Sequence, residues 1–505
     1  MQKLIFGLIA FINSSLLMAA NSVLYTPQPK ASNVNTDTHL ILSFQGEPKL
    51  SNKGTIRVYR RKDNKLIEKL DLSIPAGPVT AVNHGKNNPP YTPVAYKYDS
   101  ENYTNANTRP GTPSNIAVAN SDSFQLNIIG RFTDAFHFYP VVIHGNQATI
   151  YLHNNMLKYN ESYYVQIDST VFCSTDDDHF KGVYDKSWSF KTKKAGPSKY
   201  MGTIIVDASG KGDFNTVQGA VDFLPDYGKT PVTILIKKGQ YEEIVYFRNK
   251  SNITFRGEDK ENTRVFYANN EVFNPHPNNI STNEWPGTFP SRRAAFSCDN
   301  STDMRFENFT IATTAKGQAE GLLIMGQRNC LKNMHIIGSG DAIQINGSAY
   351  LEDCTIDGDG DTYLGRGPVY FNHCRINSYG AFMWIRNTDA NHGVVMNNCD
   401  LVCTNPDSTE IARAPVNSKR EYRYSEAVLL DCKLLGISSI GWGPLGENTT
   451  DIHYWELNST SLIDGKPVDI SRRHHASRQL TMDKDSALIQ NYRSPAYILN
   501  GWNPN

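Results

Sequence analysis

Residues 333–376 read NMHIIGSGDAIQINGSAYLEDCTIDGDGDTYLGRGPVYFNHCRI and contain one short pattern three times. The pattern is a polar residue, an apolar residue, a polar residue and then Ile or Leu. Repeats of this kind, each a short apolar strand without a helical period, indicate a solenoid whose stacked coils share one core. Counting flanking copies, the apolar second positions lie 25, 20, 20, 25 and 33 residues apart, at 309, 334, 354, 374, 399 and 432.

The spacing of apolar residues within the repeat decides which solenoid is expected. Leucine-rich repeats have a similar length, but their Leu-x-x-Leu-x-Leu spacing is absent, so we predict an all-β parallel β-helix. Four cysteines take the apolar position and should form an inward ladder of small buried side chains. Disulfides or a metal site are less favoured, since paired CxxC or His spacing is missing. The four are Cys354, Cys374, Cys399 and Cys432.

The N-terminal part has a different pattern. Residues 21–197 contain short alternating runs, such as 55–59 and 162–167, that predict the strands of a β-sandwich. The end of this part, at 186–192, resembles bacterial immunoglobulin-like modules, and we expect a spacer or docking domain without chemistry. Residues 193–198 read as a linker, which places the β-helix domain at 198–505.

Composition excludes several classes of protein. Lys+Arg and Asp+Glu are both 50, so the formal net charge is zero, which argues against a nucleic-acid partner. With 39% hydrophobic and 20% charged residues, the chain is neither disordered nor an integral membrane protein.

Residues 1–20 carry a charge, an apolar stretch and small residues, which predicts a signal peptide cleaved near Ala20. We therefore expect an exported monomer, periplasmic or extracellular, without a cofactor or metal.

Two carboxylates stand at the same phase of adjacent repeats. Asp341 lies seven residues after Met334, and Asp361 lies seven after Cys354. Stacked coils would place them at about 4.8 Å, where two like charges push one pKa upward. That arrangement supplies a nucleophile or base beside a proton donor. Register alone leaves an alternative open, because the run 357–361 also resembles a solvated turn or a calcium loop.

Eight motifs follow one another in the order and spacing of a known family. Together they resemble the pectin methylesterases (pectinesterases), carbohydrate esterases with a right-handed parallel β-helix, over residues 200–505. For example, residues 318–322 stand where the family has Gln-Ala-x-Ala-Leu, and residues 338–343 stand where it has Gly-x-Gln-Asp-Thr-Leu. The others stand at 206–218, 236–243, 253–258, 356–365, 411–415 and 497–502.

The resemblance implies hydrolysis of the methyl esters of galacturonic acid residues in a pectic polysaccharide, with release of methanol. Asp361 would be the nucleophile that forms an acyl-enzyme, and Asp341 the acid and then the base. Arg413 would hold Asp361 by a charge-assisted hydrogen bond and keep it ionised. Gln318 would donate a hydrogen bond to the developing oxyanion.

The chain departs from the family pattern at the cleft. The family's second glutamine, just before the acid/base Asp, is Gly340 here, and its sugar-stacking Trp is Pro415. Gln344 is not expected to replace the glutamine, because strand alternation would point it away from Asp341. The oxyanion hole should therefore be thinner. These changes favour a pectic polymer other than plain methylated homogalacturonan, such as a branched one.

Several residues are candidate substrate contacts. Tyr363 and Trp384 are expected to supply an aromatic platform. An insertion at 262–297 is expected to wall one end of the groove, and its Thr288 is counted among the predicted contacts. Four arginines are expected to attract free uronate carboxylates: Arg292, Arg293, Arg366 and Arg386.

Other classes of protein remain as alternatives. Parallel β-helices also occur in calcium-dependent pectate lyases, and Asp357, Asp359 and Asp361 keep that hypothesis open. A polygalacturonase usually carries Gly-His-Gly and Arg-Ile-Lys signatures, which are absent. A catalytically inactive, secreted glycan-binding β-helix is a third hypothesis, because Gly340 and Pro415 alter the site.

Overall fold

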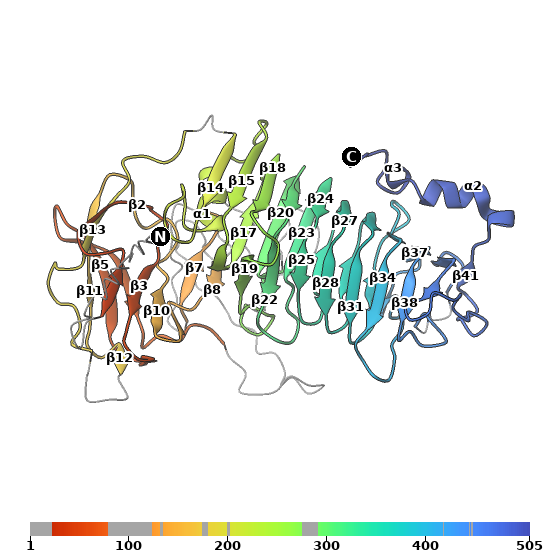
Figure 1. Cartoon of the computed structure of the whole chain (residues 1–505), viewed down its shortest axis with the longest axis horizontal. Helices are drawn as coiled ribbons and strands as arrows, with labels where there is room; N and C mark the ends of the chain where they lie inside the picture. The colour runs from red at the N-terminus through yellow and green to blue at the C-terminus, as the bar shows by residue number, and fades with distance from the viewer. Residues whose placement is uncertain are drawn as a thin grey trace, which may run out of the picture.

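A computed structural model of the chain contains two large hydrophobic cores, one in the N-terminal part and one in the stack of strands that follows. Figure 1 shows the N-terminal sheets at one end of this stack and helices α2 and α3 at the other. The structure describes residues 23–78, 124–131, 135–173, 180–198, 202–274, 291–417, 419–443, 445 and 448–504. The predicted signal peptide and Thr288 lie outside the described residues.

Two sheets of mostly antiparallel strands form the N-terminal part. They enclose a core that includes Leu42, Val58 and Trp188. The sandwich is as expected, while its assignment as an immunoglobulin-like domain with bounds 21–197 stays a prediction. One sheet has the order β1 (Leu24–Thr26), β3 (Leu40–Ser43), β10 (Gln147–Ile150), β9 (Val141–His144); the other has β2 (Ala31–Val34), β13 (Ser189–Thr192), β11 (Ser162–Ile167), β5 (Thr55–Arg60), β6 (Lys65–Asp71). A short pair joins β4 (Lys49–Leu50) to β12 (Phe172–Cys173).

Three sheets of parallel strands form the rest of the fold, which confirms the predicted parallel β-helix. The long sheet contains β14 (Thr203–Val206), β15 (Val232–Ile236), β18 (Ile253–Gly257), β21 (Arg305–Glu307), β24 (Asn329–Lys332), β27 (Ala349–Glu352), β30 (Val369–Asn372), β33 (Val394–Asn397), β37 (Glu426–Leu430), β39 (His453–Leu457) and β41 (Arg478–Gln479). The nine-stranded sheet contains β16 (Gly239–Glu242), β19 (Thr263–Tyr267), β22 (Thr310–Thr313), β25 (His335–Ile337), β28 (Thr355–Gly358), β31 (Arg375–Ser378), β34 (Asp400–Cys403), β38 (Lys433–Leu435) and β40 (Thr460–Ser461). The six-stranded sheet contains β17 (Val245–Arg248), β20 (Phe296–Thr302), β23 (Leu322–Gln327), β26 (Ile343–Ile345), β29 (Tyr363–Gly365) and β32 (Met383–Ile385).

The repeat pattern explains how each coil turns from the long sheet into the nine-stranded sheet. Its first, polar residue takes a left-handed backbone conformation, as at Asn333 (φ 51°) and Asp353 (φ 54°). Asn and Asp tolerate this conformation better than other residues with a side chain. The apolar residue that follows then points into the core. Every predicted apolar position is buried there: Phe309, Met334, Cys354, Cys374, Cys399 and Cys432.

The cysteine ladder is confirmed as a column of buried, reduced side chains. All four thiols are free, and burial raises the pKa of Cys354, Cys374 and Cys399. A thiol held neutral in an apolar core acts as a small hydrophobic side chain rather than as a metal ligand or nucleophile.

One hairpin of the N-terminal part packs on the β-helix instead of on its own sheets. It consists of β7 (Leu126–Ile128) and β8 (Ala135–His137). The ring of Phe136 lies 5.0 Å from that of Tyr246 on β17, and the two share a small apolar cluster with Ile129 and Phe273. The N-terminal part is therefore joined to the β-helix by a buried contact as well as by the linker.

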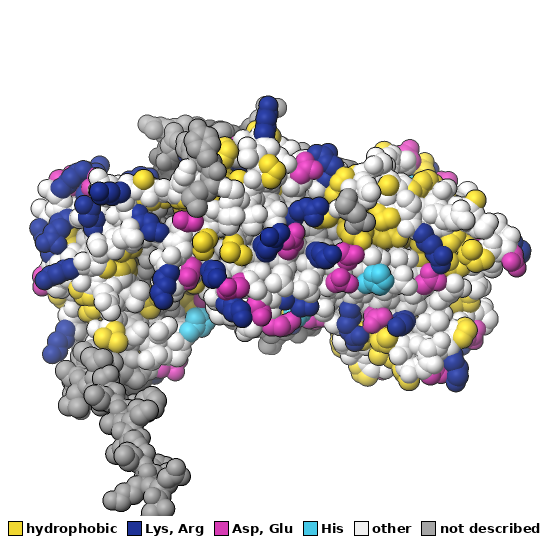
Figure 2. All heavy atoms as spheres, turned by 45° about the horizontal axis from the view of Figure 1, so that its top comes forward, with side chains coloured by type: hydrophobic (Ala, Val, Ile, Leu, Met, Phe, Trp, Pro, Cys, Tyr) yellow, Lys and Arg dark blue, Asp and Glu magenta, His cyan; other side chains and the backbone are white. Residues whose placement is uncertain are grey.

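Helices α2 (Met482–Tyr492) and α3 (Pro495–Ile498) pack on the outer face of the long sheet, while α1 (Val217–Phe223) covers the N-terminal end of the stack. Within the parts that the structure describes, no helix combines the length and apolarity that a membrane crossing needs. Figure 2 shows basic and acidic side chains interspersed over the face drawn, in keeping with a net charge of zero.

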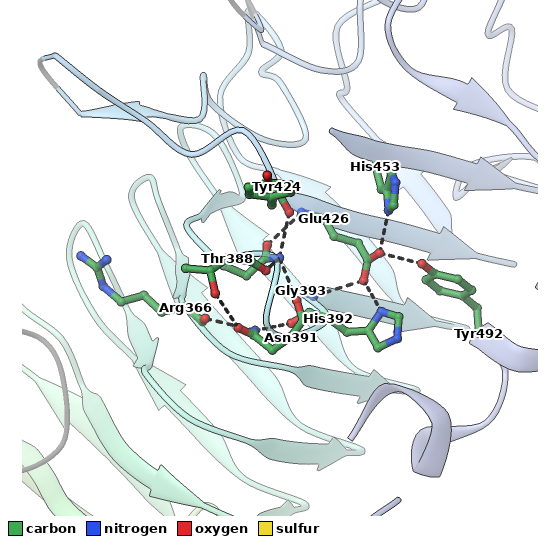
Figure 3. A network of polar contacts seen from close by, with 10 residues as sticks. Arg366, Thr388, Asn391, His392, Gly393, Tyr424, Glu426, His453 and Tyr492 are labelled. Atoms are coloured by element: carbon green, nitrogen blue, oxygen red, sulfur yellow. Dashed lines mark hydrogen bonds and ion pairs between the residues drawn. The ribbon is translucent and has the colours of Figure 1, made fainter. Parts of the chain in front are cut away.

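A buried carboxylate holds α2 against the long sheet. Glu426 on β37 accepts hydrogen bonds from Tyr492 Oη at 2.6 Å and from the backbone N–H of Gly393 at 3.1 Å. His392 Nδ1 and His453 Nδ1 lie 2.8 and 2.9 Å from its two oxygens (Figure 3). Burial alone would raise the pKa of Glu426, but these hydrogen bonds outweigh burial and hold the pKa at about 2.

Replacing Glu426 by Gln should destabilise the protein by about 2–3 kcal/mol at neutral pH, because a charged acceptor with several donors is lost. The pKa of Glu426 is depressed in the folded state, so its stabilisation is complete above about pH 4.5 and declines as the pH falls toward about 2. Denaturant unfolding of both proteins from pH 7 to pH 3 should show the difference shrinking with acidity. The exposed Glu421→Gln is the control and should change stability by less than about 0.5 kcal/mol. An equal difference at all pH values would contradict the account.

Candidate active site

Three carboxylates lie in one row on consecutive coils. Strands β23, β26 and β29 pair in parallel with Leu322, Ile343 and Tyr363 in register. Two residues before each of these positions stand Glu320, Asp341 and Asp361. The predicted pairing of Asp341 with Asp361 on adjacent coils is thus confirmed, and Glu320 extends the row by one coil.

Asp361 forms an ion pair at one end of the row. Arg413 Nη1 donates to Asp361 Oδ2 at 2.7 Å, so the predicted contact between these residues is present. Burial raises the pKa of Asp361, Arg413 opposes this effect, and the nearby charge of Asp341 adds to it, giving a pKa of about 6. The carboxyl can therefore change its charge within the physiological pH range.

Arg293 forms a second ion pair at the other end of the row. Its Nη2 lies 2.6 Å from Asp341 Oδ2 and 2.7 Å from Glu320 Oε1, and its Nη1 lies 3.5 Å from Glu271. Burial raises the pKa of Glu320; Arg293 opposes the rise, and Asp341 contributes to it. Glu320 and Asp341 share one nitrogen of Arg293, and the charge of Asp341 adds to the effect of burial on Glu320, so the pair favours retention of a proton.

These contacts correct the prediction that Arg292 and Arg293 attract substrate carboxylates. Arg293 is taken up by the three carboxylates of the protein itself. Arg292 is buried and donates to the backbone oxygen of Ala135 in the β7–β8 hairpin. Both residues stand in the predicted insertion. The sequence alone does not show that this segment contacts the β7–β8 hairpin and the carboxylates.

Tyr363 is a second correction. Its side chain points into the core of the β-helix, where its ring packs edge-on against Phe371 with centroids 5.1 Å apart. With 1% of its surface exposed, it cannot form a platform for a sugar. The residue after it, Leu364, takes the outer face because side chains alternate along a strand.

Trp384 on β32 lies among arginines. The guanidinium carbons of Arg386 and Arg413 each lie 4.1 Å from its ring centroid. Arg366 and Arg386 also approach the ring of Tyr422, at 5.9 and 6.0 Å. Stacking on Trp384 holds Arg413 over the outer face, where it meets Asp361. A role for Trp384 as a sugar platform stays a prediction.

The structure places the predicted oxyanion donor, Gln318, in an exposed turn just before β23. The second donor position holds Gly340 with φ 62°, a conformation in which a glutamine side chain would be strained. A Cβ there would also lie 3.1 Å from the backbone oxygen of Gly317. The loss of this glutamine is therefore built into the local backbone.

The three aspartates of the run 357–361 do not converge on one point. Asp357 bonds His335 Nε2 at 2.7 Å, Asp359 accepts from Ser339 at 2.6 Å, and Asp361 binds Arg413. Over the described ranges, no group of three or more His, Cys, Asp or Glu side chains is placed to hold a metal ion. Each carboxylate of the run has its own partner within the protein.

Sequence inspection missed Glu320 and Tyr422. Glu320 stands two residues before the apolar start of its strand, as Asp341 and Asp361 do, so the repeat phase contains the signal for it. Tyr422 follows β35 (Val416–Asn417) and β36 (Arg420–Glu421), a short hairpin outside the repeat, and no signal in the sequence pointed to it.

Comparisons with known proteins agree with the geometry. The family model described as Pectinesterase matches residues 203–488, more than half of the chain. Pectinesterase QRT1 of Arabidopsis thaliana is 31% identical over 164 residues, which is 31% of this chain and 42% of that protein. Pectinesterase 31 of the same plant is 29% identical over 160 residues, covering 31% of this chain and 49% of that protein. The aligned part thus spans less than half the length of these curated relatives.

Solved structures with a similar course of the chain include two pectin methylesterases. The enzyme from carrot has a TM-score of 0.49 and 22% identity, covering 60% of this chain and 95% of that chain. PemA from Erwinia chrysanthemi has a TM-score of 0.48 and 19% identity, covering 61% and 99%.

Replacing Arg293 by Met should destabilise the protein by about 3–5 kcal/mol at pH 8, because three carboxylates lose their buried counter-charge. The loss should be smaller at pH 5, where the carboxyls left behind can bind protons. Denaturant unfolding at both pH values tests this. Arg375→Met removes an exposed arginine that lies 3.4 Å from Asp400 and should cost less than about 1 kcal/mol. Similar losses of stability for the two variants would show that the buried contacts of Arg293 stabilise the protein no more than an exposed ion pair does.

Proposed function

Since the chain belongs to the pectinesterase family, we propose that it hydrolyses methyl esters of galacturonic acid residues in a pectic polysaccharide and releases methanol. The observation that carries the proposal is the Asp361–Arg413 ion pair, 2.7 Å long, beside Asp341 on the adjacent coil. An ester hydrolase of this type needs one charged and one protonated carboxyl within reach of a single carbonyl group. The row of carboxylates between two arginines supplies that combination.

In the first half of the reaction, ionised Asp361 attacks the ester carbonyl carbon and forms a tetrahedral oxyanion. Collapse of this species breaks the bond to methoxide, which leaves as methanol with a proton from Asp341. The products at this stage are an acyl-Asp361 anhydride and an ionised Asp341. The contact of one Arg293 nitrogen with both Asp341 and Glu320 supports the assignment, because the two carboxylates share this charge.

In the second half, Asp341 takes a proton from water, which attacks the anhydride and releases the uronic acid. Asp361 returns to its ionised form, and Asp341 is protonated again. The sum is ester plus water to acid plus methanol. Arg413 stabilises the carboxylate of Asp361 at the start and the end of the cycle. Gln318 is assigned as a hydrogen-bond donor to the oxyanion.

The arginines at the end of the six-stranded sheet are assigned to the polyanionic substrate. Arg366 and Arg386 follow β29 and β32 directly, on neighbouring strands whose residues Gly365 and Ile385 are in register. Guanidinium groups bind carboxylates in a bidentate manner, so the chemistry of this pair suits free uronates flanking the reacting ester, although both side chains are buried against the rings of Trp384 and Tyr422. Absence of the family's Trp at Pro415 favours a branched pectic polymer. The enzyme is proposed to act as a monomer in the periplasm or outside the cell.

Methanol release from highly methylated pectin and from a branched pectic fraction tests the proposal. Wild type should release methanol with or without a calcium chelator, and Asp361→Asn should lower kcat by about 10³-fold or more. Asp359→Asn is the matched control, because Asp359 lies two residues away, is half exposed and contacts Ser339. Its rate should stay within about threefold of wild type. No methanol from either polymer would overturn the proposal, and unsaturated sugar ends formed only with calcium would favour a lyase.

The pH profile tests the assignment of the nucleophile. Asp361 must be ionised to attack, so kcat/KM should fall about tenfold per pH unit below about pH 6. Arg413→Met removes the charge that opposes the effect of burial, so the acidic limb should move upward by about 1–3 pH units. Initial rates of methanol release from pH 4 to pH 9 measure the acidic limb of wild type and of Arg413→Met. An acidic limb that does not move in Arg413→Met would contradict the assignment of Asp361.

A further inference from the structure

Two amide side chains on β26 and its end are buried without a hydrogen-bond partner. Gln344 has none of its surface exposed, and neither its Oε1 nor its Nε2 has a partner. Asn346 is 4% exposed, and both its Oδ1 and its Nδ2 are likewise unpaired. A buried polar group without a partner is costly to the fold, so native proteins rarely keep one. The four unpaired atoms of these two amides, two residues apart, mark a place where a ligand could supply hydrogen bonds.

Both amides lie on the outer face of the six-stranded sheet. Ile343 and Ile345 are in the core of the β-helix, so Gln344 between them faces outward. Gln344 is in register with Leu323 on β23 and with Leu364 on β29. Leu364 is in turn in register with Trp384, whose ring contacts Arg413. The row Leu323, Gln344, Leu364 and Trp384 thus runs across the sheet beside the candidate nucleophile.

Asp341 lies on the same outer side. Its charge acts on Asp361, whose partner Arg413 stacks on Trp384 in the outer row. Strand alternation had suggested that Gln344 points away from Asp341. Asp341 stands in the turn before β26 and not in the strand itself, so the alternation does not extend back to it.

We propose that Gln344 donates the second hydrogen bond to the oxyanion and that Asn346 binds an oxygen of the same uronate. The proposal rests on the proposed function and deepens it. Gln344 lies on β26, the strand that follows Asp341, in register with Leu364 on β29, the strand that follows Asp361. Its Nε2 has no other partner to give up. A glutamine at position 340 would be strained, so the donor comes from the strand, four residues later. Substrate thereby completes two amides that the folded protein leaves unpaired.

Methanol release by Gln344→Met provides the test, since Met has similar length but cannot donate. The variant should lose about 10²–10³-fold in kcat with KM within about threefold of wild type. It should melt no lower than wild type, because an unpaired buried amide is replaced by an apolar group. Leu323→Met, on the neighbouring strand of the same row, is the matched control and should keep the wild-type kcat. Asn346→Leu should raise KM about tenfold and leave kcat within about threefold, since its contact forms in the ground state.

Two results of this test would overturn the inference. An unchanged kcat in Gln344→Met would show that the amide makes no transition-state contact, and a lower melting temperature would assign it a structural role. If wild type releases no methanol, the proposed function fails on its own account. In that case, calorimetric binding of a demethylated oligogalacturonide tests whether Gln344 and Asn346 contact a uronate. Weaker binding by both Gln344→Met and Asn346→Leu than by Leu323→Met would keep the amides as uronate contacts, and equal binding would overturn the inference.

Discussion

The parallel pairing of β26 with β29 is the constraint on which the candidate site depends. Ile343 stands opposite Tyr363, and the aspartates two residues earlier are carried along by that register. A slip by one residue would turn the apolar side chains of one strand out of the core and move its aspartate out of line with the other. The register is held in place by the apolar ladder below it, because Ile343, Ile345, Tyr363 and Met383 all pack in the core. Core packing thus sets the distance between two groups that would otherwise repel each other.

Charge compensation then decides how the two carboxyls differ. Arg413 faces Asp361 from a segment that runs beside β32, and Trp384 supports the guanidinium from below. Arg293 reaches Asp341 from the insertion before β20 and shares itself with Glu320 and Glu271. One carboxyl therefore has a cation almost to itself, while the other shares its cation with Glu320. This asymmetry is what a nucleophile beside a proton donor requires.

The repeat made much of this predictable. The apolar positions, the cysteine ladder and the stacking of Asp341 on Asp361 follow from spacing alone, because each coil repeats the same turn before the same strand. The same position in the repeat also contains Glu320, although the sequence analysis did not single it out. The errors lie where contacts come from outside the repeat. Arg292 and Arg293 are held by segments distant in sequence, and no periodicity reports that. Tyr363 was assigned to the cleft without regard to strand alternation, which turns its side chain into the core. For Gln344, alternation was counted through a turn, where it does not hold.

The central claim is that Asp361 carries the acyl group during turnover. Mass spectrometry of protein quenched in acid while it hydrolyses a methyl-esterified oligogalacturonide tests this most directly. The account predicts a uronyl adduct on the peptide that contains Asp361, absent from Asp361→Asn and unaffected by Asp359→Asn. An adduct on the peptide of Asp341 or Glu320 instead would contradict it, as would rapid methanol release by Asp361→Asn.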